Sequence, residues 1–264
     1  MITSRDNALI KKVIKLHTAV GRKKAGQYFT EGIRSVDQAL DVKAPVAEVI
    51  FSDRVHGLGG GGELMDRVRE AGLRTVEVSE NLFKAMCDTE SPQHIMAVID
   101  IKECDREGIL SIKEPLLLIV DGIQDPGNLG TIIRTADGAG ASAVLLLKGT
   151  TDPYSPKVIR STMGSLFSIP VLREKDTGEL FDTLHKKGIR LIASSPEGGI
   201  PYWDIDFRGG IGIIIGNEAN GISEQVMEYS DQSVMLPMPG RAESLNAAVA
   251  CGVLFYKALE QRLT

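Results

Sequence analysis

The sequence predicts an α/β protein in two parts, the second built on a parallel sheet with helices on both faces. At 264 residues, the chain is longer than one typical domain. Leu116–Val120 and Ala143–Leu147 are continuous apolar runs, as expected for strands buried on both faces. A helical pattern from Leu129 to Ala139 lies between them, and strand–helix alternation continues to the end of the chain.

The first half has a shorter α/β pattern. Its amphipathic spacing predicts a helix over Asn7–Leu16. The other expected elements are strands at Gln27–Thr30, Val46–Ser52, Val76–Val78 and Ile95–Ile101, and helices at Ile33–Leu40 and Glu63–Glu70. The polar stretch that follows has no strong periodicity. We therefore expect domains at residues 1–101 and 114–264, joined by a linker at residues 102–113.

Further strands are expected in the second half at Ile189–Ser194, Ile211–Ile215 and Ser233–Leu236, before a closing helix at Leu245–Gln261. The first part of that helix is apolar or small nearly all round. Such a helix should be buried on more than one side. Burial in the domain core and burial in a subunit interface would both explain the pattern.

Composition excludes several classes of protein. Hydrophobic residues make up 43% and charged residues 25%, which is ordinary for a folded soluble protein. The apolar runs are far shorter than the ~20 residues a bilayer needs, and no secretion signal is recognisable, so we expect a cytoplasmic protein. Cys87, Cys104 and Cys251 are widely spaced, and no two histidines have ligand spacing. Neither a disulfide framework nor a metal site is expected.

Charge is unevenly distributed along the chain. The net charge is −5, yet residues 1–30 carry seven basic side chains against one acid, Asp6. A basic segment on an acidic protein is consistent with contact to a phosphate backbone. It is equally consistent with a solvated helix face, and charge alone leaves both interpretations open.

A glycine run, Gly57–Gly62, matches the GxGxxG pattern of dinucleotide sites. In such sites the glycines come directly off a strand, so that the next helix meets the pyrophosphate. Here the expected strand ends near Ser52 and four residues intervene. The run therefore favours a surface loop, and a dinucleotide-dependent oxidoreductase is the weakest alternative.

Three polar clusters each follow an apolar strand of the second half, at the sheet edge where open α/β folds bind ligands. They are Asp121–Ala136, Ile215–Ser223 and Leu236–Ala250. In this order they closely resemble motifs one to three of the SpoU branch of the SPOUT RNA methyltransferases. Similar stretches occur at Asp6-Asn7, Thr30–Arg34, Ser91–Gln93 and Ser155–Pro170. His94 stands where that family commonly has Gly.

This resemblance implies a trefoil-knotted SPOUT catalytic domain, preceded by a smaller α/β RNA-binding domain of the ribosomal-protein-like type. It further implies a homodimer that transfers a methyl group from S-adenosylmethionine (AdoMet) to a ribose 2′-hydroxyl of RNA. Ribosomal RNA is favoured over transfer RNA because the N-terminal domain resembles those of rRNA enzymes. The alternatives are a tRNA enzyme and a catalytically silent RNA-binding module of the same fold. No metal is needed, because the sulfonium methyl is already activated and transfer requires mainly positioning.

The resemblance also assigns roles to individual residues. The expected catalytic residues are Asn128, Arg134, Glu218, Ser244 and Asn246. The expected AdoMet-binding residues are Ser194, Gly216, Asn217, Leu236, Met238, Ser244 and Leu245. With a catalytic domain present, the basic residues Lys11, Lys12, Lys15, Arg22, Lys23, Lys24 and Arg34 are interpreted as RNA contacts.

Arg134 is an unusual charge inside the apolar run of its helix. The resemblance implies that it promotes loss of the proton from the attacking hydroxyl. A guanidinium stays protonated in proteins, so it is a poor base. We expect it to hold a phosphate or the ribose oxygen and to stabilise the developing alkoxide. Partial burial with a structural ion pair is the alternative.

Overall fold

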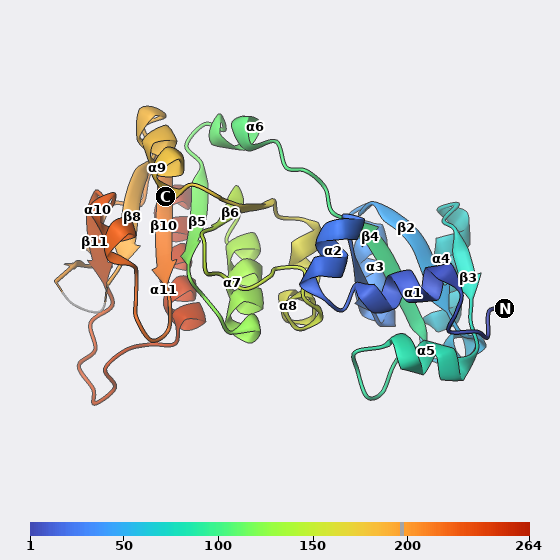
Figure 1. Cartoon of the computed structure of the whole chain (residues 1–264). Coiled ribbons are helices and arrows are strands. Elements are labelled where there is room, and N and C mark those ends of the chain that lie inside the picture. The colour runs from blue at the N-terminus through green and yellow to red at the C-terminus, as the bar shows by residue number, and fades with distance from the viewer. Residues whose placement is uncertain (196–197) are drawn as a thin grey trace. The chain divides into compact units, whose positions relative to one another are not determined.

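The computed structural model describes residues 1–195 and 198–264, and the chain folds as two units. The N-terminal unit comprises Met1–Glu103 together with Tyr154–Phe167. The C-terminal unit comprises Cys104–Pro153 and Ser168–Thr264. Each unit has its own sheet (Figure 1). Among the described residues, no helix is both long and apolar enough to cross a membrane.

The N-terminal unit contains a mixed sheet in the order β1 (Gln27–Glu31), β4 (Ile95–Asp100), β2 (Val46–Phe51) and β3 (Thr75–Glu77). Strand β4 is antiparallel to both neighbours, and β2 is parallel to β3. The helices of this unit are α1 (Ala8–Lys15), α2 (Ala19–Ala25), α3 (Ile33–Asp41), α4 (Gly61–Glu70), α5 (Glu80–Met86) and α8 (Pro156–Thr162). The apolar faces of α1 and α5 pack on the sheet through Ile10, Val13 and Phe83.

The glycine run is a helix start and not a phosphate cradle. A short 3-10 turn, Asp53–Gly57, separates β2 from the run, and α4 begins at Gly61. Gly60 has a left-handed φ of 78°, which glycine adopts without strain. A side chain on Gly61 would overlap the carbonyl of Val55. Packing of the helix start on this turn therefore accounts for two of these glycines.

The C-terminal unit contains a parallel sheet, as the sequence predicts. Its order is β7 (Val171–Arg173), β6 (Ala143–Leu146), β5 (Leu116–Asp121), β10 (Ile211–Gly216), β8 (Arg190–Ser194), β11 (Gln232–Met235) and β9 (Ile200–Pro201). The four central strands β5, β6, β8 and β10 are largely buried, which explains their continuous apolar runs.

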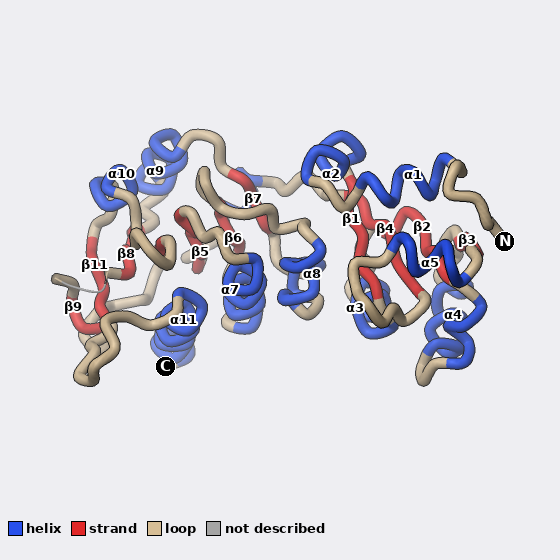
Figure 2. Tube along the Cα trace, turned by 60° about the horizontal axis from the view of Figure 1, so that its bottom comes forward, coloured by secondary structure: helices blue, strands red, loops and turns tan. Residues whose placement is uncertain are grey.

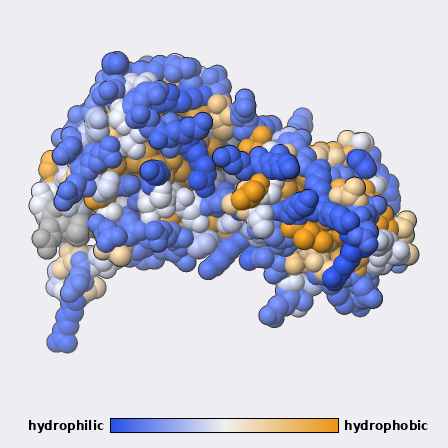
Figure 3. Space-filling view, viewed as in Figure 1, coloured by the Kyte–Doolittle hydropathy of each residue, from blue (hydrophilic) through white to orange (hydrophobic). Residues whose placement is uncertain are grey.

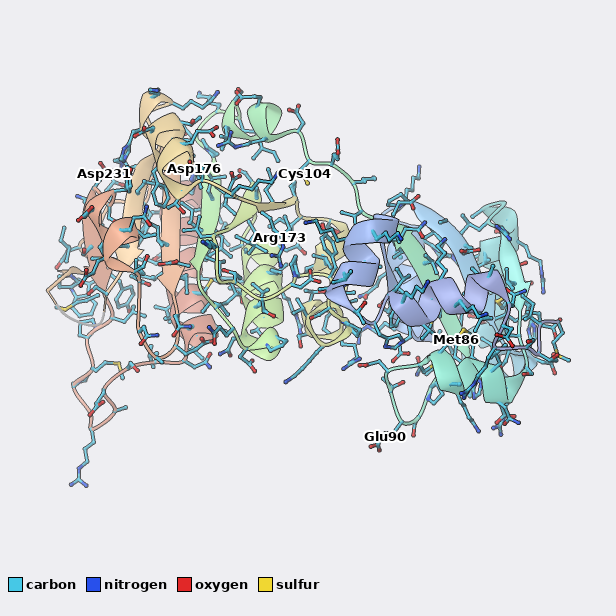
Figure 4. The ribbon with its side chains drawn as sticks, viewed as in Figure 1. Met86, Glu90, Cys104, Arg173, Asp176 and Asp231 are labelled. Carbon is cyan, nitrogen blue, oxygen red and sulfur yellow. The ribbon has the colours of Figure 1, made fainter. Side chains whose placement is uncertain are left out.

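Helices cover both faces of this sheet (Figure 2). One face carries α7 (Pro126–Gly138) and α11 (Ala247–Leu263), which pack on each other. The other carries α9 (Thr177–Lys186) and α10 (Glu224–Glu228), with core residues Leu180, Phe181 and Val226. Asp176 begins α9 by accepting a 3.0 Å bond from the backbone N of Glu179, and Asp231 accepts one of 2.7 Å from Leu191 N at the start of β8 (Figure 4).

The domain boundaries differ from those expected. The stretch at residues 102–113 contains α6 (Arg106–Leu110), whose Ile109 and Leu110 are buried in the core of the C-terminal unit. A five-residue helix is too short to give a periodic pattern. Residues 154–167 fold with the N-terminal unit although they follow β6 in the chain. Sequence order cannot reveal such an insertion, because tertiary contacts determine it.

Candidate active site

The carboxyl ends of the central strands of the C-terminal unit border a pocket of about 580 Å³. The loops after β8, β10 and β11 supply its walls, and the start of α11 closes one side. All seven expected AdoMet-binding residues line it: Ser194, Gly216, Asn217, Leu236, Met238, Ser244 and Leu245. The segment between β11 and α11 extends as a long loop from this edge (Figure 1). Ile222, within the second motif cluster, and Met227, outside all three clusters, also line the pocket.

Three of the expected catalytic residues form a hydrogen-bonded chain beside this pocket. Asn246 donates from Nδ2 to Asn128 Oδ1 at 3.0 Å, and Asn128 donates from Nδ2 to Glu218 Oε1 at 2.8 Å. Asn246 is itself fixed as the N-cap of α11, where its Oδ1 accepts from Ala248 N at 2.9 Å. Asn128 lies in the first turn of α7, whose N-cap is Asp125. Two helix starts therefore orient the carboxylate of Glu218 through its Oε1, and Oε2 lies outside this chain of bonds.

Asn217 and Asp121 shape the pocket wall. Asn217 donates to the carbonyl of Gly122 at 2.7 Å and accepts from Ala219 N and Asn220 N. Its side chain thus closes the turn after β10. Asp121, 8% exposed, accepts from Ser223 N at 2.8 Å and ties the end of β5 to the same loop. The sequence motifs assign no role to Asp121, although a carboxylate directly after a buried strand is a usable signal.

Gly216 ends β10 where the chain turns sharply back on itself. A side chain there would overlap the backbone of Gly221 and Ile222. Asn217 N and Gly221 N each bond the other residue's carbonyl, at 2.8 and 2.9 Å. Only glycine fits this tight loop, and the loop forms one wall of the pocket.

The comparisons with known proteins agree with this architecture. Residues 115–256 match the model of the SpoU rRNA Methylase family, and residues 7–97 match the MRM3-like substrate binding domain. The 23S rRNA (guanosine(2553)-2′-O)-methyltransferase RlmP of Bacillus subtilis is 36% identical, over 97% of both chains. The chain belongs to the SpoU rRNA methylase family.

Two further relatives of this SpoU chain come from Streptomyces viridochromogenes. A 23S rRNA (uridine(2479)-2′-O)-methyltransferase is 31% identical over 100% of this chain and 93% of its own length. The crystal structure of the SpoU methyltransferase AviRb in complex with the cofactor AdoMet superposes with a TM-score of 0.88. That match has 30% identity and covers 98% of this chain and 99% of that one. The resemblance seen in the motifs is confirmed.

The expected SpoU catalytic residue Arg134 stands apart from the hydrogen-bonded chain. It is exposed on α7, six residues after Asn128, which is about 9 Å along a helix axis. The alternative of a partly buried Arg134 in a structural ion pair is contradicted, because the residue is exposed and its helix face turns away from the apolar core. Within the described part of the chain, no hydrogen bond or ion pair of its guanidinium is found. Ser244 is exposed in the loop before α11 and lines the pocket.

The expected RNA-binding residues of the N-terminal unit are only partly available. Arg22 is 4% exposed and donates from Nη1 to the carbonyls of Leu16 and His17, at 2.8 and 3.0 Å. It caps the end of α1, and its assignment to RNA is wrong. Lys12 bonds the buried carboxylate of Glu48 at 3.2 Å, and Lys11 pairs with Asp6 at 2.8 Å. Lys11 is exposed despite its ion pair, and so are the other four expected residues, Lys15, Lys23, Lys24 and Arg34.

Cysteines and potential metal ligands are not grouped together in the part of the chain that the structure describes. Among residues 1–195 and 198–264, no group of His, Cys, Asp or Glu side chains has the arrangement of a metal site. Cys87, Cys104 and Cys251 are all free thiols, and burial raises the pKa of Cys251 far above its ordinary value. The polar side chains that line the pocket are amides, hydroxyls and carboxylates.

Proposed function

We propose that this protein transfers a methyl group from AdoMet to a ribose 2′-hydroxyl of ribosomal RNA. The observation that carries the proposal is the chain of Asn246, Asn128 and Glu218 at the rim of a pocket built by the SpoU motifs. The relatives named as 23S rRNA 2′-O-methyltransferases support the substrate and the reaction.

The pocket suits AdoMet in size and lining. Ligand pockets typically measure ~300–1,000 Å³ and combine apolar walls with a few polar groups. Here Leu236, Met238 and Leu245 offer aliphatic surface for an adenine ring. The polar groups of Ser194, Ser244 and the backbone around Gly216 are available to its edge, to the ribose and to the methionine moiety. Bound there, AdoMet would supply a methyl group that is already activated on sulfonium.

The residues beside the pocket would position the nucleophile. In the transfer, the ribose 2′-oxygen bonds the methyl carbon as the methyl–sulfur bond breaks, and the hydroxyl proton passes to the carboxylate of Glu218. Glu218 has a carboxylate oxygen, Oε2, outside its bond to Asn128, and we assign to it the hydrogen bond from the 2′-hydroxyl. Asn128 and Asn246 keep that carboxylate oriented. Arg134 would stabilise the negative charge that develops on the oxygen.

A homodimer would explain why Arg134 lies away from Glu218. Helix α11 exposes Val249 at 52% and Tyr256 at 53%, and the Tyr256 hydroxyl lies against Gly138 of α7. Burial in the core of one chain therefore does not account for the whole apolar surface of α11. We propose that a second copy covers this face of α7 and α11 and that Arg134 serves the pocket of the partner subunit. Sedimentation analysis of Tyr256→Glu, expected to be monomeric, tests the interface.

The trefoil knot and the cytoplasmic location belong to the same proposal. After β11 the chain must return past the loop after β10 to reach α11, which packs on α7 near the middle of the sheet. On that return path the C-terminal segment would pass through an earlier loop, as a trefoil knot requires.

Free cysteines in all three positions are consistent with a reducing compartment.

The deciding experiment is transfer of labelled methyl from AdoMet to unmodified ribosomal RNA and, separately, to transfer RNA. We expect label at a ribose 2′-oxygen of ribosomal RNA, abolished in Arg134→Ala. Label in transfer RNA alone would move the substrate to that class. No label in either RNA, with AdoMet still bound, would point to a silent RNA-binding protein. Repeating the assay with assembled ribosomal particles separates that outcome from a need for a particle as substrate.

A further inference from the structure

A pair of neighbouring aromatic residues, Tyr202 and Trp203, lies at the same sheet edge as the pocket. We call this pair the aromatic step. Trp203, the single tryptophan of the chain, is 53% exposed. Its ring meets that of Tyr202 in a T-shaped arrangement, with centroids 5.1 Å apart. Large aromatic side chains are usually well buried in folded proteins. A tryptophan held in solvent therefore requires an explanation that the core does not supply.

The sheet register places this step beside the pocket. Strand β9 is parallel to β11, so the carboxyl ends of both strands lie at the same edge. Tyr202 N donates to the carbonyl of Met235 at 3.0 Å. Met235 directly precedes Leu236, which lines the pocket. The backbone of the aromatic step is thus one residue away from the pocket wall.

The turn that carries Trp203 is held at both ends. Before it, β9 is bonded to β11, and Asp204 N closes the turn on the carbonyl of Pro201 at 2.9 Å. After it, Ile205 and Phe207 are buried. Gln261 of α11 accepts from Phe207 N at 2.8 Å and donates to the carbonyl of Ile205 at 2.9 Å. The ring is therefore presented from a fixed backbone, which lowers the entropic cost of binding.

The surroundings favour a base over a phosphate or a protein. Asp204 is exposed next to Trp203, and its carboxylate would repel a phosphate while accepting hydrogen bonds from base amino groups. In the described segment from residue 198 to residue 207, the other exposed large apolar residue is Ile200, at 39%. The hydrophilic character of much of this unit is visible in Figure 3. The exposed apolar surface of two side chains is large enough to stack one base. It is far smaller than the ~1,200 Å² that a stable protein interface buries.

We propose that Trp203, supported by Tyr202, stacks on an unpaired base of the RNA next to the ribose that receives the methyl group. Sequence-specific proteins commonly read single-stranded RNA by stacking its bases on aromatic rings. The inference rests on the proposed methyltransferase function and adds a recognition subsite outside the AdoMet pocket. A stacking role for Trp203 also explains why this edge of the sheet carries a fixed aromatic turn.

Fluorescence provides a direct test, because tryptophan emission, excited selectively over that of tyrosine, comes from position 203 alone. We expect a single-stranded RNA oligonucleotide of mixed sequence to quench it in the absence of AdoMet. Inorganic polyphosphate, which carries the charge without bases, should leave it unchanged. Unchanged emission at RNA concentrations that saturate a filter-binding assay would overturn the proposal. A change in emission with protein concentration, without RNA, would assign the step to contact between copies and would also overturn it.

Methyl transfer to unmodified ribosomal RNA separates this inference from the function on which it rests. Trp203→Ala should raise the KM for RNA by roughly 5- to 100-fold and leave AdoMet affinity unchanged. Trp203→Phe should recover most of the loss, whereas Ile200→Ala, the matched control, should have no effect. An unaltered KM in Trp203→Ala would overturn the stacking role and leave the methyltransferase proposal intact. Absence of transfer by the unmodified chain would contradict the proposed function itself.

Discussion

Asn128 and Glu218, 90 positions apart in the sequence, share a hydrogen bond of 2.8 Å from amide Nδ2 to carboxylate Oε1. The bond joins the first turn of α7 to the loop after β10. Parallel pairing of β5 with β10 makes it possible, because Asp121 and Gly216 are register partners at the ends of these strands. The two loops that follow must therefore meet.

The charge of Glu218 is the first testable feature. Glu218→Gln keeps an oxygen that accepts from Asn128 but removes the negative charge offered to the 2′-hydroxyl. We expect the single-turnover rate of methyl transfer to fall by ~10²-fold or more, with AdoMet affinity unchanged. Glu224→Gln, on the exposed start of α10, serves as control. A rate close to that of the unmodified chain would remove Glu218 from the chemistry.

Arg134 is expected to act through both the positive charge and the planar geometry of its guanidinium group. Arg134→Lys should lose at least ~10-fold in rate, because an ammonium cannot donate two parallel bonds. If Arg134 serves the partner's pocket, inactive Arg134→Ala and Glu218→Gln subunits should regain activity when unfolded and refolded together. Mixed dimers then contain one pocket with both groups intact. No recovery, with mixed dimers demonstrated by mass spectrometry, would contradict action across the interface.

Sequence alone predicted the parallel sheet and the meeting of the three motif clusters, because buried strands and strand-end polar residues leave local patterns. It could not distinguish Arg22 from Lys23. Both belong to one basic run, and only the turn between α1 and α2 directs Arg22 inward onto two carbonyls. Nor could it place α8, whose membership of the N-terminal unit depends on tertiary contacts. Trp203 went unnoticed for the same reason, since its exposure is a property of the folded turn.

Gly216 should be intolerant of any side chain. Gly216→Ala forces the backbone of Gly221 and Ile222 to move, which we expect to destabilise the C-terminal unit by ~1–3 kcal/mol. The displaced loop would also weaken AdoMet binding, measured by calorimetry. Gly240→Ala is the matched control, because its added methyl group meets no atom within 4 Å. Equal behaviour of the two variants would show that the loop after β10 adapts freely.

Substitution of Arg22 should reduce stability, whereas substitution of Lys24 should reduce RNA binding. Arg22→Ala leaves the carbonyls of Leu16 and His17 without their buried donor and should cost ~1–3 kcal/mol. Hydrogen exchange would locate the loss in α1 and α2. Lys24→Ala, exposed two positions on, should leave stability unchanged but weaken RNA binding and reduce its salt dependence. Loss of RNA affinity in Arg22→Ala without any loss of protection would restore it as an RNA contact.

His94 should make the N-terminal unit sensitive to mild acid. The residue is 6% exposed, has a left-handed φ of 57°, and its Nδ1 bonds Ser52 Oγ at 2.8 Å. Burial lowers the pKa of His94 below its ordinary value of 6.5, and the nearby cation Arg54 lowers it further. The unfolded chain therefore binds a proton at a pH where the folded chain does not. The contribution of neutral His94 to the free energy of unfolding is complete above about pH 6.5. It declines as the pH falls towards the pKa of His94 in the folded chain.

The variant that isolates this titration is His94→Asn, since asparagine tolerates the left-handed conformation and carries no titrating group. Urea unfolding of the N-terminal unit, followed by hydrogen exchange, should show a smaller loss of stability between about pH 7 and pH 5 than in the unmodified chain. His56→Asn, at an exposed position, should leave the pH dependence unaltered. The same slope in His94→Asn as in the unmodified chain would mean that other groups control the acid sensitivity.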